Sequence, residues 1–580
     1  MNRSPRSDIL PGLRWQFIVL AVGLLLLLVG LTFLLIRRPL AQDTPPEAQP
    51  ISFIESQVYT EAVVGQPELV NPLLADSQLD RDLVSLVYSG LTRIDEYGQP
   101  VPDLAKDWTV SRDGLTYTFT LRDDVTWHDG QPFTAEDVAF TMALLRDPDF
   151  PAAPDLSSFW RTVETYADDD HTVRFILTQP LAAFPEYAGI GLLPAHLLAG
   201  LSPAEIPGDS FNQAPVGTGR LAWISAEPDG ERLSSVHLEP YPDYYDARRA
   251  VSLEAVVMRF YPDSSQAFAA LGPDAQGFGG LSAPQLEAAL GSASLNVYSA
   301  PLPDYVAIVF NQQAPDRLPF FQDTLVRQAL FAALDREQIV EEALPRMALL
   351  ANSPILPGTW AYTAVTPPEA DPARANTLLE DAGWTLSGSR RSLDGVDLAF
   401  TLLVSDSPTD RRIGERVAEQ WRQVGVDVNL EELDAADLVG RLQTTTDQGR
   451  DFDAALVEFG QGRLADPDPY PIWHQSQIED GLNISGFSDR DISEALEIAR
   501  KDPNGVRRAE LYAQFQQLFM ERAAAILLYH PIYHYAVSCQ VTGVQLKVYV
   551  DPADRFRNLQ DWHIASSAER LEACPVQDGG

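Results

Sequence analysis

An uncharged stretch close to the start of the chain limits which residues can fold in water. Residues 15–36 (WQFIVLAVGLLLLLVGLTFLLI) contain no charged side chain. As a helix they would extend about 33 Å, against about 30 Å for the hydrocarbon core of a bilayer. A cleaved signal peptide usually has only about 7–15 apolar residues before its cleavage site. We therefore expect a transmembrane signal anchor at 15–36, with a cleaved signal as the alternative.

The charges beside this stretch predict its orientation. Three arginines precede it, and two follow it directly. Cytoplasmic flanks of membrane spans carry the excess of Lys and Arg. We expect 1–14 to be a cytoplasmic tail and 37–50 to be a stalk. The rest is then the extracytoplasmic domain of a single-pass protein in the cell membrane.

Cysteine usage agrees with export. Cys539 and Cys574 are the only cysteines among 580 residues. An even number in an exported domain favours a disulfide. Two unrelated buried thiols are the alternative. We expect a Cys539–Cys574 bridge near the C-terminus.

The overall charge excludes one class of partner. The chain has 42 Lys and Arg against 82 Asp and Glu, a net charge of −40, although its first 38 residues are positive. The body of the chain therefore repels phosphate backbones. We expect no nucleic-acid partner.

The motifs of several enzyme classes are missing. None of the three lysines follows a glycine as a P-loop requires, and G-x-S-x-G is absent. G-x-G-x-x-A occurs at 217–222 and 460–465, but no helical pattern follows either match to hold a pyrophosphate. His530 and His534 are four residues apart, yet Pro531 lies between them in strand-like sequence. We predict no catalytic residue, no cofactor and no metal site.

Hydrophobic periodicity divides the chain into a strand-rich and a helix-rich part. Residues 115–121 alternate apolar side chains with Thr, which predicts a half-buried strand. Thr134 and Asp137 resemble a capping box at the start of a helix over 135–147. Strands predominate to about residue 310. Helical spacing then recurs at 323–344, 371–383, 409–425, 489–501 and 507–524.

Further strand patterns lie between and after these helices. Residues 396–405 and 452–460 alternate with the helices, which predicts an α/β domain with a mostly parallel sheet. Strand patterns return at 526–538 and 541–550. The chain thus runs from one domain into a second and back, and such crossovers form a natural hinge.

A series of short motifs occurs in the order and spacing of a known family. They are PDLA (102–105) with Trp108, DGLTYTF (113–119) with LR (121–122), WHDG (127–130), TAEDV (134–138), PVGTG (215–219), FN (310–311), VRQAL (326–330) with DR (335–336), and DP (466–467). Together they resemble the family 5 extracellular solute-binding proteins, the oligopeptide-, dipeptide- and nickel-binding components of ATP-binding-cassette (ABC) importers. Most of these residues are typical of scaffold: Trp127 as a packed indole, and Arg327 with Asp335 as polar contacts on one helix.

The resemblance implies an α/β fold with two lobes, the periplasmic-binding-protein fold of type II or cluster C, with an extra subdomain. The implied segments are 51–92, 216–300 and 524–580 for lobe I, 93–215 for the extra subdomain, and 301–523 for lobe II. The implied function is capture of a peptide or a related small solute by lobe closure, followed by delivery to an ABC permease with its ATPase. We expect a monomer without enzymatic activity. A membrane-anchored peptide-sensing ectodomain with a signalling partner is the alternative.

The resemblance also implies where a ligand is held. Residues 68–71 match the early loop that lies against the ligand, and 459–470 match the second-lobe loop. Peptide binders of the family usually carry a Trp and then an Asp in this second loop, shortly before Asp-Pro, and that Asp pairs with the α-amino group of the ligand. Aligned on Asp466-Pro467, this sequence has Gly460 and Arg463 in those places.

A cation cannot pair with an ammonium group. We therefore hypothesise that the ligand presents an anionic or hydroxyl-rich end to Arg463. The alternative is an alignment slip, with Asp466 or Asp468 pairing with the amine. Trp360 and Tyr470 are either aromatic walls of the site or core residues. The candidate ligand-binding residues are Glu68, Leu69, Val70, Asn71, Trp360, Phe459, Gly460, Gly462, Arg463, Asp466 and Tyr470.

Overall fold

The computed structural model describes residues 57–446, 449–460, 462, 464–479 and 481–565, which belong to one compact unit that begins at Gln57. The predicted tail, anchor and stalk lie outside the described residues, as do Arg463 and Cys574. Within the described part of the chain, no helix combines the length and the apolar character needed to cross a membrane.

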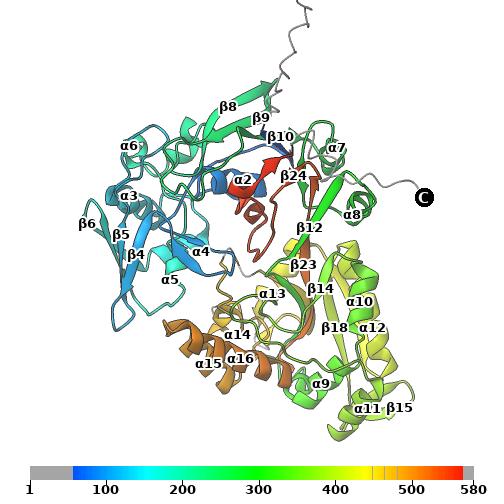
Figure 1. The fold of residues 1–580 in the computed structure, drawn as a ribbon. Helices are drawn as coiled ribbons and strands as arrows, with labels where there is room; N and C mark the ends of the chain where they lie inside the picture. Colours follow the sequence, from blue (N-terminus) through cyan, green and yellow to red (C-terminus); the bar gives the residue numbers. More distant parts are fainter. Residues whose placement is uncertain (1–56, 447–448, 461, 463, 480, 566–580) are drawn as a thin grey trace, which may run out of the picture. The chain divides into compact units, whose positions relative to one another are not determined.

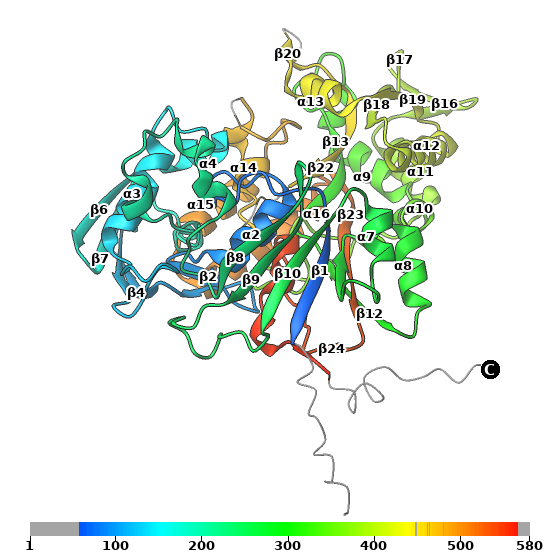
Figure 2. The ribbon, with the colours of Figure 1, turned by 90° about the horizontal axis from the view of Figure 1, so that it is seen from above.

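One mixed sheet runs through the described residues (Figures 1 and 2). Its main path is β19 (Asp427–Leu433), β18 (Ala399–Ser405), β22 (Ala454–Phe459), β13 (Tyr305–Phe310), β23 (Ile526–Ser538), β11 (Gly277–Gly279), β1 (Val58–Val64), β10 (Ala255–Tyr261), β9 (Arg232–Pro240) and β8 (Leu221–Asp229). Two more strands, β12 (Leu295–Pro301) and β14 (Ala348–Leu350), also pair with β23. The predicted strand at 526–538 is therefore confirmed, and it is the element that joins the two halves of the sheet.

The pairing of β23 changes at its middle. Up to Pro531 it pairs with β13 and β14, and from Ile532 it pairs with β12 and β11. We name the strands from β13 to β19, with the helices packed on them, lobe II. The strands from β11 to β8 and the elements packed on them form lobe I. The chain passes between the lobes along β23 and at residues 302–304, between β12 and β13.

A small sheet lies on the lobe I side, in the order β4 (Ala105–Val110), β5 (Thr116–Leu121), β7 (Thr172–Leu177) and β6 (Val163–Asp169). As the alternation predicts, the apolar residues of β5 are buried, and its Thr residues are more exposed. Helix α3 (Ala135–Arg146) begins at the predicted capping box of Thr134 and Asp137. Trp127 is fully buried and donates its indole N–H to Asp137.

The other elements of lobe I complete this side of the molecule. They are α2 (Gln78–Val87), β2 (Thr92–Ile94), β3 (Pro100–Pro102), α4 (Pro154–Trp160), α5 (Phe184–Tyr187), α6 (Ala195–Leu198), η1 (Ile206–Gly208), η2 (Ser210–Gln213), α7 (Ser264–Ala269), α8 (Ala283–Leu290), β24 (Val541–Thr542), η5 (Pro552–Phe556), η6 (Leu559–Asp561) and β25 (His563–Ile564).

Lobe II covers both faces of its sheet with helices. Its further elements are η3 (Pro319–Gln322), α9 (Thr324–Ala332), α10 (Arg336–Ala343), α11 (Pro372–Asp381), β15 (Thr385–Ser387), β16 (Arg390–Leu393), β17 (Val396–Asp397), α12 (Pro408–Gln423), α13 (Ala435–Gln443), β20 (Thr445–Thr446), β21 (Gly449–Arg450), α14 (Tyr470–Trp473), η4 (Gln475–Gln477), α15 (Arg490–Lys501) and α16 (Gly505–Glu521). Strand β13 is buried along its whole length, because its alternate residues enter two separate hydrophobic cores. Burial of both faces explains its continuous apolar sequence.

Three local predictions for the second half of the chain are wrong. The helix expected over 323–344 is two helices, because Asp335 caps α10 by accepting from the backbone N–H of Gln338. Arg327 therefore does not share a helix with Asp335, and it donates instead to backbone carbonyls such as that of Ala523. The lobe II sheet is mixed, since β18 pairs in parallel with β19 and β22 whereas β13 is antiparallel to β22 and β23.

The third wrong prediction concerns residues 541–550. Only β24 is a strand there, and it pairs with β25. The rest of the segment bonds to side chains of η5 and of the residues after it, as when Val550 donates its N–H to Asp554. An alternating sequence does not form a strand where no neighbouring strand edge is available.

A chamber between the two lobes

A small chamber lies where the lobes meet. Its lining on lobe II and the linker before it is Pro303, Leu356, Thr359, Leu464, Ala465 and Pro467, and its lining on lobe I is Val548, Tyr549 and Val550. No lining residue is charged, and the cavity of about 10 Å³ has room for a single water molecule. We call this the interlobe chamber. Any solute larger than a water molecule can enter the chamber only after the lobes separate.

The lobe II wall continues into a buried ion pair. Asp466, which is 6% exposed, accepts from the Arg508 guanidinium at 2.6 Å. Arg508 also lies over the ring of Trp360, 4.9 Å from its centroid. Tyr512 packs beside both residues, with its hydroxyl 3.5 Å from Asp466. The Asp466 carboxylate is thus compensated by an arginine of its own lobe.

A second acid of the same loop is compensated in a similar way. Asp468 pairs with Arg500 at 3.3 Å, and Arg500 lies over the ring of Tyr470 at 4.6 Å. Burial raises the pKa of Asp468 to about 6, although Arg500 opposes the shift. Tyr470 itself stacks on His474. Both acids that the sequence offers as amine partners are therefore engaged by arginines.

A carboxylate from lobe I reaches across to this loop. Glu186, on α5, accepts from the backbone N–H of Ala465 and, at 3.0 Å, from that of Asp466. Burial, with the neighbouring Asp466 charge, raises the pKa of Glu186 to about 8. Close by, the N–H of Ala182 donates to the carbonyl of Arg500 at 2.8 Å. These contacts hold α5 of lobe I against Asp466 and Arg500 of lobe II.

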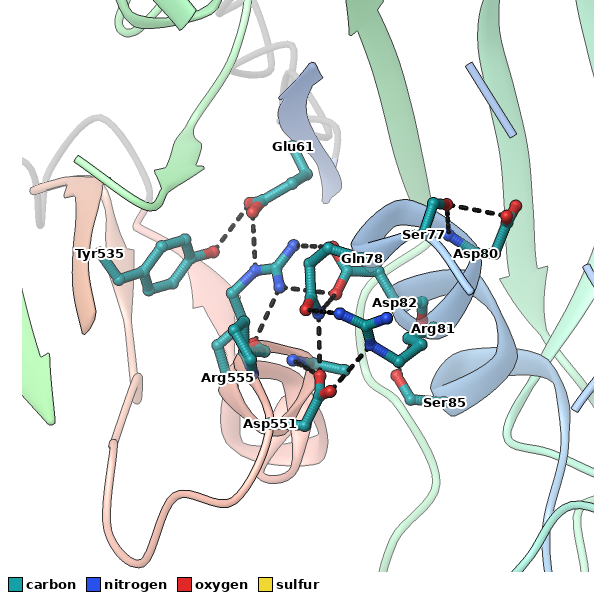
Figure 3. A network of polar contacts seen from close by, with 12 residues as sticks. Glu61, Ser77, Gln78, Asp80, Arg81, Asp82, Ser85, Tyr535, Asp551 and Arg555 are labelled. Atoms are coloured by element: carbon teal, nitrogen blue, oxygen red, sulfur yellow. Dashed lines mark hydrogen bonds and ion pairs between the residues drawn. The ribbon is translucent and has the colours of Figure 1, made fainter. Parts of the chain in front are cut away.

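The lobe I wall is fixed by a buried ionic network (Figure 3). Arg555 lies between Glu61, at 2.8 Å, and Asp82, and all three side chains are almost fully buried. The hydroxyl of Tyr535 donates to Glu61 at 2.8 Å. The network joins η5 to α2 and to β1, and thereby positions residues 548–550 at the chamber. Burial raises the pKa of Glu61, although Arg555 opposes the shift.

The predicted residues of the early loop lie elsewhere. Glu68 is exposed, and its backbone N–H donates to Asp80 at 2.9 Å. Val70 and Asn71 are buried, and Asn71 donates to the side chain of Asn212 at 3.0 Å. Neither they nor Leu69 line the chamber. Their contact with a ligand stays a prediction.

The other predicted ligand-binding residues divide into three groups. Phe459 packs in the core against Tyr305, while Gly460 and Gly462 are exposed. Trp360, Asp466 and Tyr470 lie in the ion-pair cluster just described. Arg463 falls outside the described residues. The sequence pointed to this loop but not to Glu186, Arg508 or Arg555, which no motif distinguishes from ordinary surface charges.

The two histidines that are four residues apart both lie on β23 and bond to neighbouring segments. His530 bonds through Nδ1 to the carbonyl of Asp304, and His534 bonds to Ser299 and to the carbonyl of Arg346. Among the described residues, no group of three or more His, Cys, Asp or Glu is arranged to hold a metal ion.

A sheet shared by two lobes, with a chamber at their junction, defines a two-lobed solute-binding protein. The sequence profile of the bacterial extracellular solute-binding proteins, family 5 (middle region), matches residues 99–480, so the chain belongs to this family. It is the extracytoplasmic substrate-binding component of an ABC importer and not an enzyme.

Curated relatives cover most of the chain. The oligopeptide-binding protein AppA of Bacillus subtilis is 27% identical over 87% of this chain and 90% of its own length. The dipeptide-binding protein of Escherichia coli is 26% identical over 83% and 90%.

Solved structures agree with the fold. AppA of B. subtilis in complex with a nonapeptide has a TM-score of 0.63 at 26% identity, covering 88% of this chain and 99% of that one. NikZ of Campylobacter jejuni in complex with Ni(L-His) has a TM-score of 0.65 at 27% identity, covering 88% and 100%. HbpA2 of Haemophilus parasuis, at 22% identity, supports the fold alone with a TM-score of 0.77 over 88% and 100%.

Proposed function

We propose that the interlobe chamber is where this protein captures its solute, and that the solute is a peptide or a related small molecule. The observation that carries the proposal is the chamber itself, which is lined from both lobes and lies beside the strand that joins them. The names of the oligopeptide- and dipeptide-binding relatives support the ligand class. Extended peptides bind largely through backbone hydrogen bonds, which an uncharged chamber accommodates.

The engagement of both loop acids supports a further point about the ligand. Asp466 and Asp468 are already paired with Arg508 and Arg500. To pair with either acid, an ammonium group would have to displace an arginine, the buried Arg508 or the partly buried Arg500, which is costly. We therefore propose that the ligand is not held by a free α-amino group, and that an anionic or hydroxyl-rich end meets Arg463.

A peptide library tests this proposal. A soluble form that begins at Gln57 is incubated with peptides that have free or acetylated amino ends, and native mass spectrometry identifies those that bind. We expect acetylated peptides to bind as well as free ones, and Arg463→Ala to weaken both. A strict requirement for a free amine, unchanged in Arg463→Ala, would refute the Arg463 hypothesis but not the peptide specificity.

Three further features remain proposals. We propose that 15–36 anchors the protein in the cell membrane, and that Cys539 pairs with Cys574. Cys539 is buried, whereas Cys574 and the anchor lie outside the described residues. We also propose the lobe segments stated above, with 93–215 as the extra subdomain. Resistance of the full chain to extraction from membranes by carbonate tests the anchor. The mass of the chain after alkylation, with and without prior reduction, tests the disulfide.

A further inference from the structure

A second hollow in lobe I is lined by four arginines. Its volume is about 260 Å³, and Arg93, Arg220, Arg249 and Arg557 contribute to its wall. These arginines come from β2, from the residue before β8, from the loop after β9 and from the residue after η5. Four distant segments of a chain with a net charge of −40 thus bring positive groups together. We call this hollow the arginine pocket.

The carboxylates of the arginine pocket are already paired. Asp103 pairs with Arg249 at 3.2 Å and also accepts from the hydroxyl of Tyr245. Asp554 pairs with Arg557. The third acid of the wall, Asp551, pairs with Arg81 at 2.9 Å. None of these carboxylates forms an ion pair with Arg93 or Arg220.

Neither of those two arginines forms an ion pair within the described part of the chain, although the Asp103 carboxylate lies near enough to attract both. Arg220 is 6% exposed and donates only to neutral oxygens, among them the carbonyls of Phe556 and Arg557. Burial and the nearby Arg249 lower the pKa of Arg220 to about 9. Arg93 is half-buried, and its Nε, which is fully buried, has no hydrogen-bond partner among the described residues. Burial and Arg249 lower the pKa of Arg93 too, although Asp103 opposes the shift.

Such an arrangement is unfavourable without an anion. Burying a cation without an ion-pair partner is costly, and a second cation nearby adds to that cost. The planar guanidinium group donates two parallel hydrogen bonds to a carboxylate or a phosphate. Ser89 and Tyr244 contribute to the same wall.

We propose that the arginine pocket binds a small oxyanion, a carboxylate or a phosphate group, with Arg93 as the direct donor and Arg249 and Arg220 as the source of positive potential. The pocket and the interlobe chamber share Val550 in their walls. The anion is therefore either the acidic end of a captured solute or a free inorganic ion. The proposal does not depend on which solute the interlobe chamber takes.

The test uses the soluble form from Gln57 with three probes: inorganic phosphate, citrate, and a tetrapeptide with a free or an amidated carboxyl end. Binding is measured by calorimetry in a buffer without oxyanions. We expect at least one anionic probe to bind, and Arg93→Gln to weaken its binding about tenfold. The matched control is Arg112→Gln, an exposed arginine of the same lobe that makes the same charge change. It should bind like the wild type.

A second measurement does not require a ligand. Because Arg93 is partly buried and forms no ion pair, Arg93→Met should raise the melting temperature in oxyanion-free buffer and should remove the stabilisation that the bound probe gives the wild type. Binding of phosphate or citrate identifies a free anion. Binding of the free-carboxyl peptide alone, lost on amidation, identifies the solute. Absence of binding by every probe, or equal binding by Arg93→Gln and wild type, would overturn the proposal.

Discussion

At the residue scale, Glu186 is the contact between the lobes that responds to pH. Its pKa, raised to about 8 by burial and by Asp466, is well above the ordinary value of 4.5. With the lobes in contact the carboxyl therefore keeps its proton at a pH where an exposed Glu is ionised. Between pH 4.5 and pH 8 the form with the lobes in contact binds more protons than the form with the lobes apart. The contact through Glu186 therefore weakens as the pH rises through this range.

Hydrogen exchange of the segment 464–467 tests this pH dependence. After correction for intrinsic exchange rates, we expect protection in the wild type to fall between pH 6 and pH 8. Glu186→Gln cannot ionise and should lose most of this dependence. Asp468, whose pKa burial raises to about 6, also ionises in this range, but it is present in both proteins, so the difference between the two pH slopes is due to Glu186. The same pH slope in both proteins would contradict the role given to Glu186.

Arg508 is the counter-charge of the buried Asp466 carboxylate. Arg508→Met leaves the Asp466 carboxylate buried without a counter-charge, beside Glu186. We expect a loss of about 3–5 kcal/mol in the free energy of unfolding, measured with urea. The control is Arg507→Met, because Arg507 is exposed, pairs with Asp502 at the surface, and should cost less than about 1 kcal/mol.

A double variant separates charge from packing at this site. Asp466→Asn in the Arg508→Met background removes the unpaired carboxylate and should recover part of the loss. If the double variant were less stable than Arg508→Met by the full cost of Asp466→Asn alone, the two residues would not interact.

At the element scale, β11 is a strand that accepts no side chain at its first residue. A Cβ on Gly277 would lie 1.7 Å from the Tyr59 hydroxyl and 2.3 Å from the Glu61 carboxylate. Gly277→Ala should therefore destabilise lobe I by about 1–3 kcal/mol through overpacking. Gly200→Ala, where a Cβ meets no atom within 4 Å, is the control. Equal melting temperatures of Gly277→Ala and Gly200→Ala would contradict this prediction, because Tyr59 and Glu61 would then move aside without loss of stability.

The elements that the sequence predicted correctly are those with a strong local signal. Strand β5, helix α3 with its capping box, and β23 follow from alternation or from a cap. The end of the helix before Asp335 and the loop after β24 depend on partners elsewhere in the chain. Hydrophobic periodicity therefore predicted one long helix and a strand in their place, and both predictions are wrong. The site was harder still. Glu186 meets a loop 279 residues later, and Arg555 meets Glu61 from 494 residues away, so no local pattern connects them.

At the scale of the whole molecule, the two lobes share one sheet but have separate cores. Lobe I has its large core around Trp127, Trp160 and Trp562, and lobe II has two cores on the faces of its sheet. Two segments, β23 and residues 302–304, carry the chain between them. Separate cores joined by few segments allow the lobes to move as bodies while each stays intact.

A disulfide across the lobes tests the central claim, which is that the solute enters between them. A Cβ built on Gly98, in lobe I, lies 3.7 Å from the Cβ of Ala465, in lobe II, which is within the range of a disulfide. The variant Gly98→Cys with Ala465→Cys should therefore lock the lobes together when it is oxidised without solute. The wild type, with and without reductant, controls for the native cysteines.

The decisive measurement is capture of the peptide library by this double variant, oxidised and then reduced, followed by native mass spectrometry. We predict that the oxidised protein captures nothing and that reduction restores the capture seen with the wild type. Equal capture by the oxidised and reduced forms would contradict the account, because the solute would then bind without passing between the lobes.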